Sequence, residues 1–425
     1  MTRFAYALAW AIAAPLAVLR LAWRARRQPG YGERIGERFG FYAPVPAAPR
    51  IWIHAVSVGE TRAAAPIVAA LAARHPGHRI LLTHMTPTGY ATGIELFGDR
   101  VERAWLPYDL RFAARRFVSH YRPEMGLVME TEVWPRLFEE CARAGVPVAL
   151  VNGRLSERSA RRYARAPGFA RWAFGALAGV AAQGEGDAQR FRALGARHVA
   201  ATGNVKFDLD VPQAQLELGR ELRRRFGAAR SVWVAGSTRE GEEALLLDAF
   251  ALLPPATAPL LVIVPRHPQR FDEVAALARD KGFEVARRSD AAGVPAATRV
   301  VVGDSMGEML AYYEAADVVL VGGSFLAYGS QNLIEPCALG KPVIVGPSTY
   351  NFQEAAEGAI AAGAARAVSD AAAGIAAAHA LAQDAAERIR MGEKGREFVA
   401  AHRGAVRRLL DWLEATLRPS GRAPG

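Results

Sequence analysis

An arginine and a histidine stand side by side at the end of an apolar segment in the second half of the sequence. The stretch VPRHP, residues 264–268, carries Arg266 and His267 between two prolines. Arginine offers a planar set of donors that suits phosphate oxygens or the acceptors of a pyrimidine, and the prolines restrict the backbone that presents it. A solvated arginine in an ordinary turn would give the same pattern. Both interpretations stay open from these residues alone.

Three further segments place small residues directly after apolar ones. They are VAGSTREGEE (234–243), which includes Ser237, GDSMGEM (303–309), and VGGSFLAYGSQNLIEP (321–336), which includes Gly323 and Ser324. A turn of this kind that opens a helix presents backbone amides to an anion such as phosphate. Glu335 could accept hydrogen bonds from the two hydroxyls of a ribose, and it could equally complement the dipole of the helix that it begins. The pattern favours a nucleotide-type ligand.

A carboxylate in the first half of the chain marks a change of local structure. The stretch IHAVSVGE, residues 53–60, begins like a buried strand, and apolar residues recur at helical spacing directly after Glu60. Glu60 is therefore expected at a strand-to-helix turn. A helix amino terminus stabilises the ionised carboxylate and lowers its basicity. We expect any chemical use of Glu60 to depend on its reach and not on a raised pKa.

Several other chemistries lack their motifs. The glycines match neither a GxxxxGK[ST] loop nor the GxGxxG spacing of a dinucleotide site, no HExxH occurs, and METE (129–132) resembles no set of metal ligands. Cys141 and Cys337 have no CxxC or Cys/His neighbourhood, which argues against a disulfide framework or a structural zinc site. We expect neither a metal nor a cofactor, and a reducing compartment.

The elements that must position these residues alternate between strand and helix. Short apolar segments separated by helical ones run from Arg50 to about Gly203, and after a charged interruption at 210–231 the pattern resumes from Val232. Alternation of this kind indicates βαβ units in parallel sheets, with ligands at the carboxyl ends of the strands. The expected fold is α/β, with two Rossmann-like domains facing a cleft. The boundaries expected are an N-terminal helix 1–28, a first domain 29–212, a second domain 213–418 and a tail 419–425, and the last helical segment could also return to the first domain.

Composition limits the class of partner. The 425 residues are 51% hydrophobic and carry a formal net charge of +11. This positive charge favours nucleic acid, a phosphorylated small molecule or anionic lipid headgroups as partners. Part of the charge is local, in Arg20–Arg27 and Arg154–Arg165, which favours a docking surface.

The amino terminus is apolar from Phe4 to Trp23, interrupted by Pro15 and Arg20, and an arginine-rich segment follows it. About 20 apolar residues are enough to cross a bilayer core. A secretory peptide would carry its charge before the apolar run, so we interpret the segment as a retained anchor or an interfacial helix, with the rest of the chain on the cytoplasmic side. A core helix of the first domain is the alternative.

A series of motifs in a fixed order carries a resemblance to a known family. They are RIGERFGFY, IHAVSVGE, LPYDL, METEVWPRL, NGRLSERS, TGNVKFD, AGSTREGEE, VPRHPQRF, VGDSMGEM, ADVVLVGGS, NLIEP and GKPVIVGP. Together they resemble the 3-deoxy-D-manno-octulosonic acid (Kdo) transferases of lipopolysaccharide synthesis, from about Gly32 to about Phe352. The resemblance implies a monotopic inner-membrane glycosyltransferase of the GT-B type, with the acceptor site in the first domain and CMP-Kdo in the second.

The resemblance also implies roles for single residues. Glu60 matches the general base of the family, and Glu130 and Lys206 match positions that stabilise the transition state. The positions that match the CMP site are Pro265, Arg266, Met306, Gly307, Glu308, Asn332, Leu333, Ile334 and Glu335, with Ser237, His267, Gly323 and Ser324 as possible additions. A plain ion pair between Glu130 and Lys206 is the alternative to their catalytic role.

This sequence departs from the family in the donor loop. Where the family commonly has GGHNPLEP, this chain has GSQNLIEP, so Ser330, Gln331 and Leu333 replace glycine, histidine and proline. Arg239 stands where a histidine is frequent. Asn332 and Glu335 are retained, which keeps the loop as a donor-binding segment with an altered backbone.

The leading hypothesis is an inverting transfer of Kdo from CMP-Kdo to a lipid A precursor at the cytoplasmic face of the inner membrane, with the basic surface on an anionic membrane. A GT-B transferase or epimerase of another nucleotide sugar, such as a UDP donor, is the second hypothesis. A non-catalytic membrane scaffold or a nucleic-acid-binding protein is the third. This third hypothesis does not account for Glu60, Glu130 and Lys206 at strand ends. The sequence also lacks the interleaved aromatic residues that a protein binding single-stranded nucleic acid would need.

Overall fold

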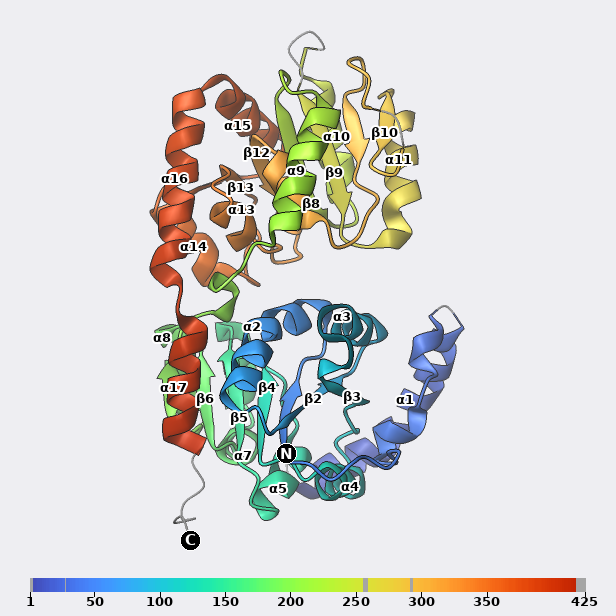
Figure 1. The fold of residues 1–425 in the computed structure, drawn as a ribbon, viewed down its shortest axis with the longest axis vertical. Helices are drawn as coiled ribbons and strands as arrows, with labels where there is room; N and C mark the ends of the chain where they lie inside the picture. Colours follow the sequence, from blue (N-terminus) through green and yellow to red (C-terminus); the bar gives the residue numbers. More distant parts are fainter. Residues whose placement is uncertain (1–2, 27, 255–258, 291–292, 418–425) are drawn as a thin grey trace. The chain divides into compact units, whose positions relative to one another are not determined.

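The computed structural model describes residues 3–26, 28–254, 259–290 and 293–417, and its chain divides into two compact units. The first unit contains the residues up to Asp208 and those from Gly404 onward, and the second contains Leu209–Arg403 (Figure 1). The second domain expected at 213–418 therefore includes a final helix that belongs to the first unit. The expected tail, 419–425, lies outside the described residues.

The first unit is a parallel seven-stranded sheet in the order β3-β2-β1-β4-β5-β6-β7. Its strands are β1 (Arg50–His54), β2 (Arg79–His84), β3 (Glu102–Trp105), β4 (Met125–Met129), β5 (Val148–Gly153), β6 (Gly179–Ala182) and β7 (Val199–Ala201). Its helices are α1 (Arg3–Ala25), α2 (Val58–Arg74), α3 (Pro87–Phe97), α4 (Arg111–Tyr121), α5 (Pro135–Arg143), α6 (Glu157–Ala164), α7 (Pro167–Gly175), α8 (Glu185–Ala193) and α17 (Ala405–Leu417), with short 3₁₀ turns η1 (Pro29–Tyr31), η2 (Ile35–Phe39), η3 (Gly98–Arg100) and η4 (Val205–Phe207).

The second unit has a parallel seven-stranded sheet in the order β10-β11-β9-β8-β12-β13-β14. Its strands are β8 (Val232–Thr238), β9 (Leu260–Pro265), β10 (Val285–Arg287), β11 (Val300–Val302), β12 (Val318–Val321), β13 (Val343–Val345) and β14 (Ala365–Ala367). Its helices are α9 (Gln213–Phe226), α10 (Glu242–Ala251), α11 (Phe271–Asp280), α12 (Met309–Ala315), α13 (Ile334–Ala338), α14 (Gln353–Ala361), α15 (Ala371–Gln383) and α16 (Ala385–His402), with the turn η6 (Pro268–Arg270). The α/β class and the two Rossmann-like domains are confirmed.

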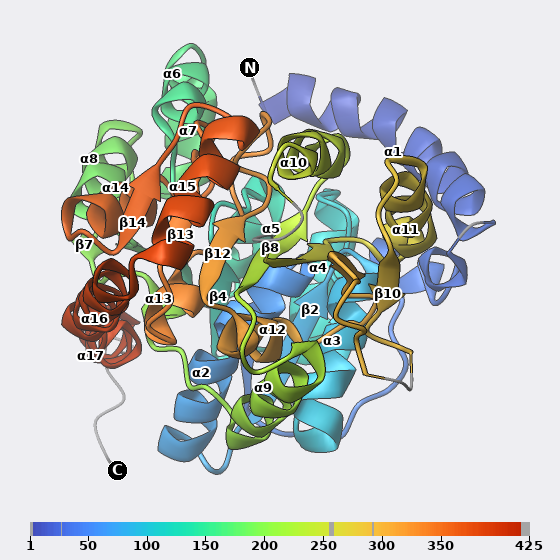
Figure 2. The same cartoon turned by 90° about the horizontal axis from the view of Figure 1, so that it is seen from above.

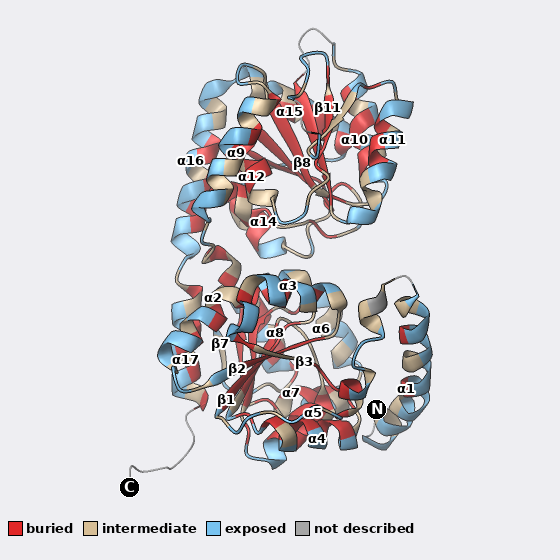
Figure 3. Cartoon of the chain, turned by 45° about the vertical axis from the view of Figure 1, so that its right-hand side comes forward, coloured by how far each residue is buried: buried red, intermediate tan, exposed pale blue. Residues whose placement is uncertain are grey.

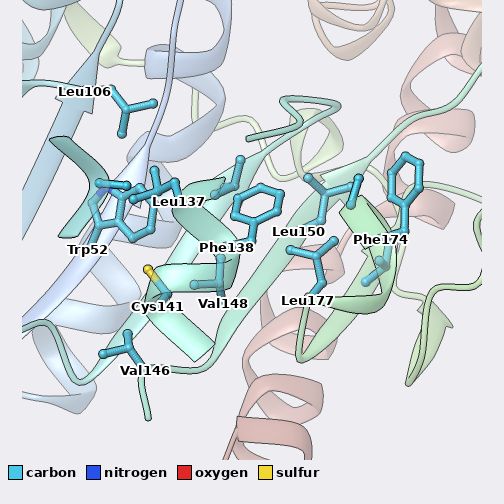
Figure 4. Packing of buried hydrophobic residues seen from close by; sticks show 14 of the residues in the cluster. Trp52, Leu106, Leu137, Phe138, Cys141, Val146, Val148, Leu150, Phe174 and Leu177 are labelled. Atoms are coloured by element: carbon cyan, nitrogen blue, oxygen red, sulfur yellow. The ribbon is translucent and has the colours of Figure 1, made fainter. Parts of the chain in front are cut away.

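Both faces of the first sheet are covered, which is why its strands are almost uniformly apolar. On one face Trp52, Phe138 and Phe174 pack with residues of α4, α5 and α7 (Figure 4). Trp52 lies so close to β4 that a Cβ on Gly126 would stand 2.4 Å from its ring, so glycine is required there. The other face packs on α2 and on Leu409 and Leu413 of α17. The last helix of the chain thus completes the core of the first unit.

The charged segment at 210–231, which interrupts the strand pattern in the sequence, contains helix α9 of the second unit. Gly219 lies against α12, where a Cβ would stand 2.5 Å from the side chain of Glu314. Arg223 donates to Asp317 at 2.7 Å, and the same carboxylate accepts the amide of Val232 at 2.8 Å. The segment belongs to the packed unit and begins it.

Helix α1 runs as one helix across Pro15, and it follows a curved path as expected for an internal proline (Figure 2). Tyr6 donates to Asp109 of the first unit at 2.6 Å, and Trp10 stacks on Tyr108 with ring centroids 5.6 Å apart. The opposite side is a stripe of exposed apolar side chains, which we call the α1 stripe: Phe4, Leu8, Ile12, Leu16, Leu19 and Trp23. By length and composition α1 could cross a membrane, and only 11% of its most apolar window is buried (Figure 3). A core helix is therefore the wrong interpretation of this segment.

Candidate active site

Glu60 lies in the first turn of α2, directly after β1, as the sequence predicted. Ser57 caps the helix by accepting the amide of Glu60 at 3.4 Å. In return the carboxylate of Glu60 accepts the amide of Val56 at 2.8 Å and the hydroxyl of Ser57 at 3.0 Å. This reciprocal capping fixes the half-buried carboxylate in one orientation.

The basicity expected for Glu60 is wrong. Burial, followed by the nearby carboxylates of Glu130 and Glu132, raises the pKa of Glu60 to about 7, although the amide of Val56 and the hydroxyl of Ser57 act in the opposite direction. The helix dipole, which motivated the expectation, is a local effect, whereas the two other glutamates come from a distant part of the chain. Glu60 gains basicity as well as reach.

Glu130 follows β4 in a left-handed backbone conformation, with φ of +56°. Its amide donates to the carbonyl of Val151 at 2.9 Å, and its carboxylate forms an ion pair with Lys206, with Nζ and Oε1 2.7 Å apart. Burial alone would raise the pKa of Glu130, but Lys206 and Arg154 outweigh it, and the pKa is lowered. The ion pair that the sequence left as an alternative exists, and it keeps Glu130 ionised beside Glu60.

Lys206 stands on the turn η4, which a polar network holds in place. Asn152, at φ of +52°, accepts the amide of Val205 at 3.1 Å. Asn204 accepts the amide of Lys206 at 3.0 Å and donates to Gln183 at 3.2 Å. These three amide side chains fix the lysine relative to the ends of β5 and β6.

The strand order explains why these residues meet. β1 and β4 are neighbours in the sheet, with Ile53 opposite Leu127, and the order of the strands reverses direction between them. In open α/β sheets the loops at this switch point diverge and leave room for a ligand. Glu60 follows one of these strands and Glu130 the other, so the two carboxylates lie where the fold leaves space for a substrate.

In the second unit, Pro265 ends β9, and Arg266 and His267 follow it. The amide of Arg266 donates to the carbonyl of Thr238 at 3.0 Å, which ties this loop to the end of β8. Burial, with the charges of Arg239, Arg266 and Arg270, lowers the pKa of His267. His267 is therefore neutral at pH 7, and positive charge at this strand end comes from the arginines.

The segment after β11 carries Met306, Gly307 and Glu308. Met306 is exposed, and Gly307 adopts φ of +80°, which favours glycine. Glu308 pairs with Arg288 at 3.1 Å and accepts the hydroxyl of Ser305 at 2.6 Å. The carboxylate of Glu308 therefore stands in an ordered polar cluster.

The altered donor loop keeps a left-handed backbone without the glycine of the family. Ser330 has φ of +71°, and its amide donates to the carbonyl of Gly323 at 2.7 Å. Asn332 accepts the amide of Ile334 at 3.0 Å and donates to the carboxylate of Glu335 at 2.9 Å. Leu333 and Ile334 are buried and anchor the loop. The retained pair Asn332 and Glu335 thus forms one hydrogen-bonded unit.

The three small residues considered as additional anion contacts have different surroundings. The amides of Gly323 and Phe325 donate to the buried carboxylate of Glu242 at 2.6 and 2.9 Å, so this turn already binds an anion that the chain itself supplies. Ser324 is fully buried and donates to the carbonyl of Val321 at 2.5 Å. Ser237 has φ of +56° at a bulge of β8. Among these residues only Ser237 is partly exposed.

Comparison with known proteins places the chain. A sequence model described as 3-deoxy-D-manno-octulosonic-acid transferase (kdotransferase) matches residues 33–209. The 3-deoxy-D-manno-octulosonic acid transferase of Bordetella pertussis is 46% identical over 97% of this chain and 99% of that protein. The enzyme of the same name from Haemophilus influenzae is 37% identical over 98% of this chain and 99% of its own length. The chain belongs to this family of Kdo transferases.

Solved structures support the fold of this Kdo transferase. A glycosyltransferase from Rickettsia africae has a TM-score of 0.60 at 13% identity and covers 88% of this chain and 100% of its own. Anabaena HepE, in complex with UDP and glucose, has a TM-score of 0.58 at 13% identity, with 87% and 99% coverage. At this identity the likeness concerns the fold alone, which is GT-B, as expected.

Several residues around the site of the Kdo transferase were missed by the sequence analysis. Glu132 has a raised pKa because of burial and the neighbouring Glu130. Asn152 accepts the amide of Val205, next to Lys206, and Glu242 accepts the amide of Gly323. Each side chain thereby holds one loop of the candidate site in place. The two adjacent glutamates of GEE, Glu242 and Glu243, are visible in the sequence. Only the sheet order shows that the carboxylate of Glu242 reaches the loop after β12.

Proposed function

We propose that this transferase moves Kdo from CMP-Kdo to a lipid A precursor such as lipid IVA, with inversion at the anomeric carbon. The observation that carries the proposal is the position of Glu60, whose pKa of about 7 suits a general base and which stands beside the Glu130–Lys206 pair. The family supplies the identity of the sugar, and the relatives named Kdo transferases cover nearly the whole chain.

In the proposed step Glu60 takes the proton of an acceptor hydroxyl while the oxygen of that hydroxyl forms a bond to the anomeric carbon. The bond from this carbon to the phosphate oxygen breaks at the same time, and CMP leaves with the electron pair. Lys206, oriented by Glu130, offsets the negative charge of the donor phosphate and of the sugar carboxylate. Preorganised charge of this kind contributes about 10²- to 10³-fold to a rate.

The proposed CMP contacts come from the loops at the carboxyl ends of β9, β11 and β12 of the second unit. Arg266 would contact the phosphate, and Glu335, oriented by Asn332, would accept the ribose hydroxyls. The remaining proposed contacts are Pro265, Met306, Gly307, Glu308, Leu333 and Ile334, with Ser237 and His267 at the margin. The amide of Gly323 and the hydroxyl of Ser324 already form hydrogen bonds within the protein. These two residues would therefore support the loop of the CMP site without contacting CMP.

We also propose that α1 lies in the cytoplasmic interface of the inner membrane. The inner side of the helix is tied to the first unit by Tyr6 and Asp109, and the α1 stripe on the other side is free to enter the acyl region. Arg20, Arg24 and Arg26 near its end would face anionic headgroups.

The test is an incubation of the purified protein with CMP-Kdo and lipid IVA, in the presence of a chelator, followed by mass spectrometry of the lipid. A gain of one or more Kdo masses is expected, and the mass also counts the residues transferred. Competition with CMP and with UDP identifies the donor, because inhibition by UDP alone would overturn the Kdo assignment. Glu60→Gln serves as the inactive variant. Glu185→Gln is its matched control, since Glu185 also follows a glycine in the first turn of a helix.

A further inference from the structure

A cavity of about 450 Å³ lies on the first unit, and none of its lining residues belongs to the candidate active site. Its lining comes from the first turn of α1, the end of α5 and the end of α7: Arg3, Glu139, Ala142, Arg143, Arg171, Trp172, Gly175 and Ala176. α5 and α7 end where the chain turns back toward the amino ends of β5 and β6, whereas Glu60 and Glu130 follow the carboxyl ends of their strands. The cavity is therefore separate from the catalytic groups.

The cavity carries an excess of positive charge. Arg3 and Arg143 both pair with Glu139, at 3.1 and 2.8 Å, and Arg136 adds a third guanidinium to the same carboxylate at 3.1 Å. Arg171 is exposed, and its side chain makes no hydrogen bond or ion pair with any residue that the structure describes. Arg143 also pairs with Glu140, which Arg111 contacts as well, so two carboxylates face five guanidinium groups and the site favours an anion.

The shape of the cavity suits a small group and not a bare ion. Ala142, Gly175 and Ala176 are small and leave the space open, and Trp172 forms a rigid wall. The guanidinium groups of Arg3 and Arg136 lie over the indole of Trp172, at 5.6 and 5.0 Å from its centroid. A volume of this size is in the range of pockets that hold small organic ligands, which is about 300 to 1,000 Å³.

The cavity opens beside the start of the α1 stripe. The guanidinium of Arg136 donates to the carbonyl of Arg3 at 2.8 Å, which fixes the first turn of α1 at the cavity, and Phe4, the next residue, is 78% exposed. A molecule with an anionic head and acyl chains could therefore place its head among the arginines and its chains along the stripe.

We propose that this cavity binds the headgroup of an anionic glycerophospholipid, with the phosphate held by Arg143 and Arg171. Arginine suits phosphate because its planar donors match two oxygens at once. The inference rests on the membrane association proposed for α1, and it makes the anchor selective for a headgroup. The chemistry of the phosphate is shared with free inorganic phosphate, and the experiment must separate the two.

The probes are dihexanoyl-phosphatidylglycerol and dihexanoyl-phosphatidylcholine, used below the concentration at which they form micelles. Binding to the full chain is measured by calorimetry, so no vesicle and no transfer activity is needed, and a failure of the proposed function does not affect the result. We expect the phosphatidylglycerol probe to bind at least tenfold more tightly than the phosphatidylcholine probe. Arg143→Ala with Arg171→Ala should weaken the first probe at least tenfold.

Two further variants keep the test decisive. Ala142→Phe fills the cavity from an exposed position without a change of charge, and it should weaken binding as the double variant does. Arg158→Ala with Arg162→Ala removes the same charge from exposed positions on α6 and should leave binding unchanged. Equal losses in the α6 pair would reduce the effect to general electrostatics and overturn the site. Inorganic phosphate that binds as tightly as the lipid probe, or equal binding of the two lipids, would overturn the assignment of a phospholipid.

Discussion

The two units of this transferase place a glutamate at the same point of their folds and give it opposite surroundings. Glu60 follows β1 and Glu242 follows β8, and in each unit this strand lies next to the switch point. Glu60 accepts one amide and one hydroxyl from its own turn and stays half-buried. Glu242 is fully buried and accepts three amides, those of Arg239, Gly323 and Phe325. The difference teaches that the fold supplies the position, and that the partners of the carboxylate separate the proposed base Glu60 from the supporting Glu242.

The same comparison extends to backbone strain. Glu130 in the first unit and Ser237 and Ser330 in the second are non-glycine residues in the left-handed region. Such residues cost about 1 to 3 kcal/mol each and persist where the surroundings fix them. In the first unit Glu130 carries the carboxylate proposed to act in catalysis and Asn152 holds the turn of Lys206, whereas Ser237 and Ser330 in the second unit shape loops.

The largest effect is expected from Glu60→Gln. The amide keeps the shape of the side chain but cannot take the proton, so kcat should fall about 10³-fold, within the range for general bases. CMP binding to the second unit, measured by calorimetry, should be unchanged. The control is Glu185→Gln. Full activity in Glu60→Gln would show that Glu60 is not the base, and its role would then not differ from the supporting role of Glu242.

Lys206→Met should lower kcat about 10²-fold, because the cation that offsets the donor charge is lost. The same change removes the partner of Glu130, so the pKa of Glu130 should rise. The cluster of carboxylates then lacks this cation, so the acid limb of the pH profile of kcat/KM is expected to shift toward higher pH. Lys394→Met, at an exposed pair with Glu397, is the control. An unchanged rate in Lys206→Met would show that Glu130 and Lys206 form only a structural ion pair.

Glu242→Ala should act on stability and not on proton transfer. It leaves the amides of Gly323 and Phe325 buried without an acceptor, at a cost of about 1 to 3 kcal/mol for each group. We expect a lower melting temperature and a raised KM for CMP-Kdo, with kcat largely retained in the folded fraction. Glu242→Asp, which keeps the charge, should recover part of both. A fall in kcat without a loss of stability would make Glu242 a chemical group like Glu60.

The pH dependence of kcat/KM is expected to follow from the raised pKa of Glu60. The base must be deprotonated, so kcat/KM should fall about tenfold for each pH unit below 7 and level off above it. Initial rates between pH 4 and 8.5, with saturating CMP-Kdo and with lipid below its KM, measure this limb. A midpoint near 4.5, the ordinary value of a glutamate, would show that burial does not tune this residue.

The smallest effect is expected from Ser330→Gly. Glycine adopts φ of +71° without strain, so the variant should gain about 1 kcal/mol of stability. Thermal unfolding of the full chain measures the gain, and Ser324→Gly, which removes buried hydrogen bonds, should show the opposite sign. A loss of stability in Ser330→Gly would show that the hydrogen bond from the Ser330 hydroxyl to the carbonyl of Gln331 outweighs the strain.

Most of the fold could be predicted because its strands are rich in valine, leucine and isoleucine and are separated by helical segments. β14 was missed, since Ala365–Ala367 contains alanine and arginine and no β-branched residue. The segment that forms α9 was interpreted as a charged interruption of the pattern, because its charged face hides the buried positions Gly219, Leu222 and Phe226. In both cases tertiary packing, and not local propensity, decides the structure.

The candidate site was predictable in its residues but not in its electrostatics. Glu60 could be placed at a helix start, yet its pKa depends on Glu130 and Glu132, which are about 70 residues away in the sequence. Gly323 looked like a free anion site because the sequence does not show that Glu242 occupies it. Long-range carboxylates are the information that a linear pattern lacks.

The return of α17 to the first unit has a consequence for synthesis of the protein on the ribosome. Asp208 accepts the amides of Gly404 and Val406, and Leu409, Leu410 and Leu413 cover one face of the first sheet. That apolar face stays uncovered until the last residues of the chain emerge, so the first half cannot finish folding before the second half has been made. A nascent chain that stops shortly after Arg403 would expose this surface to chaperones and to aggregation, although every proposed catalytic and donor residue would already be present.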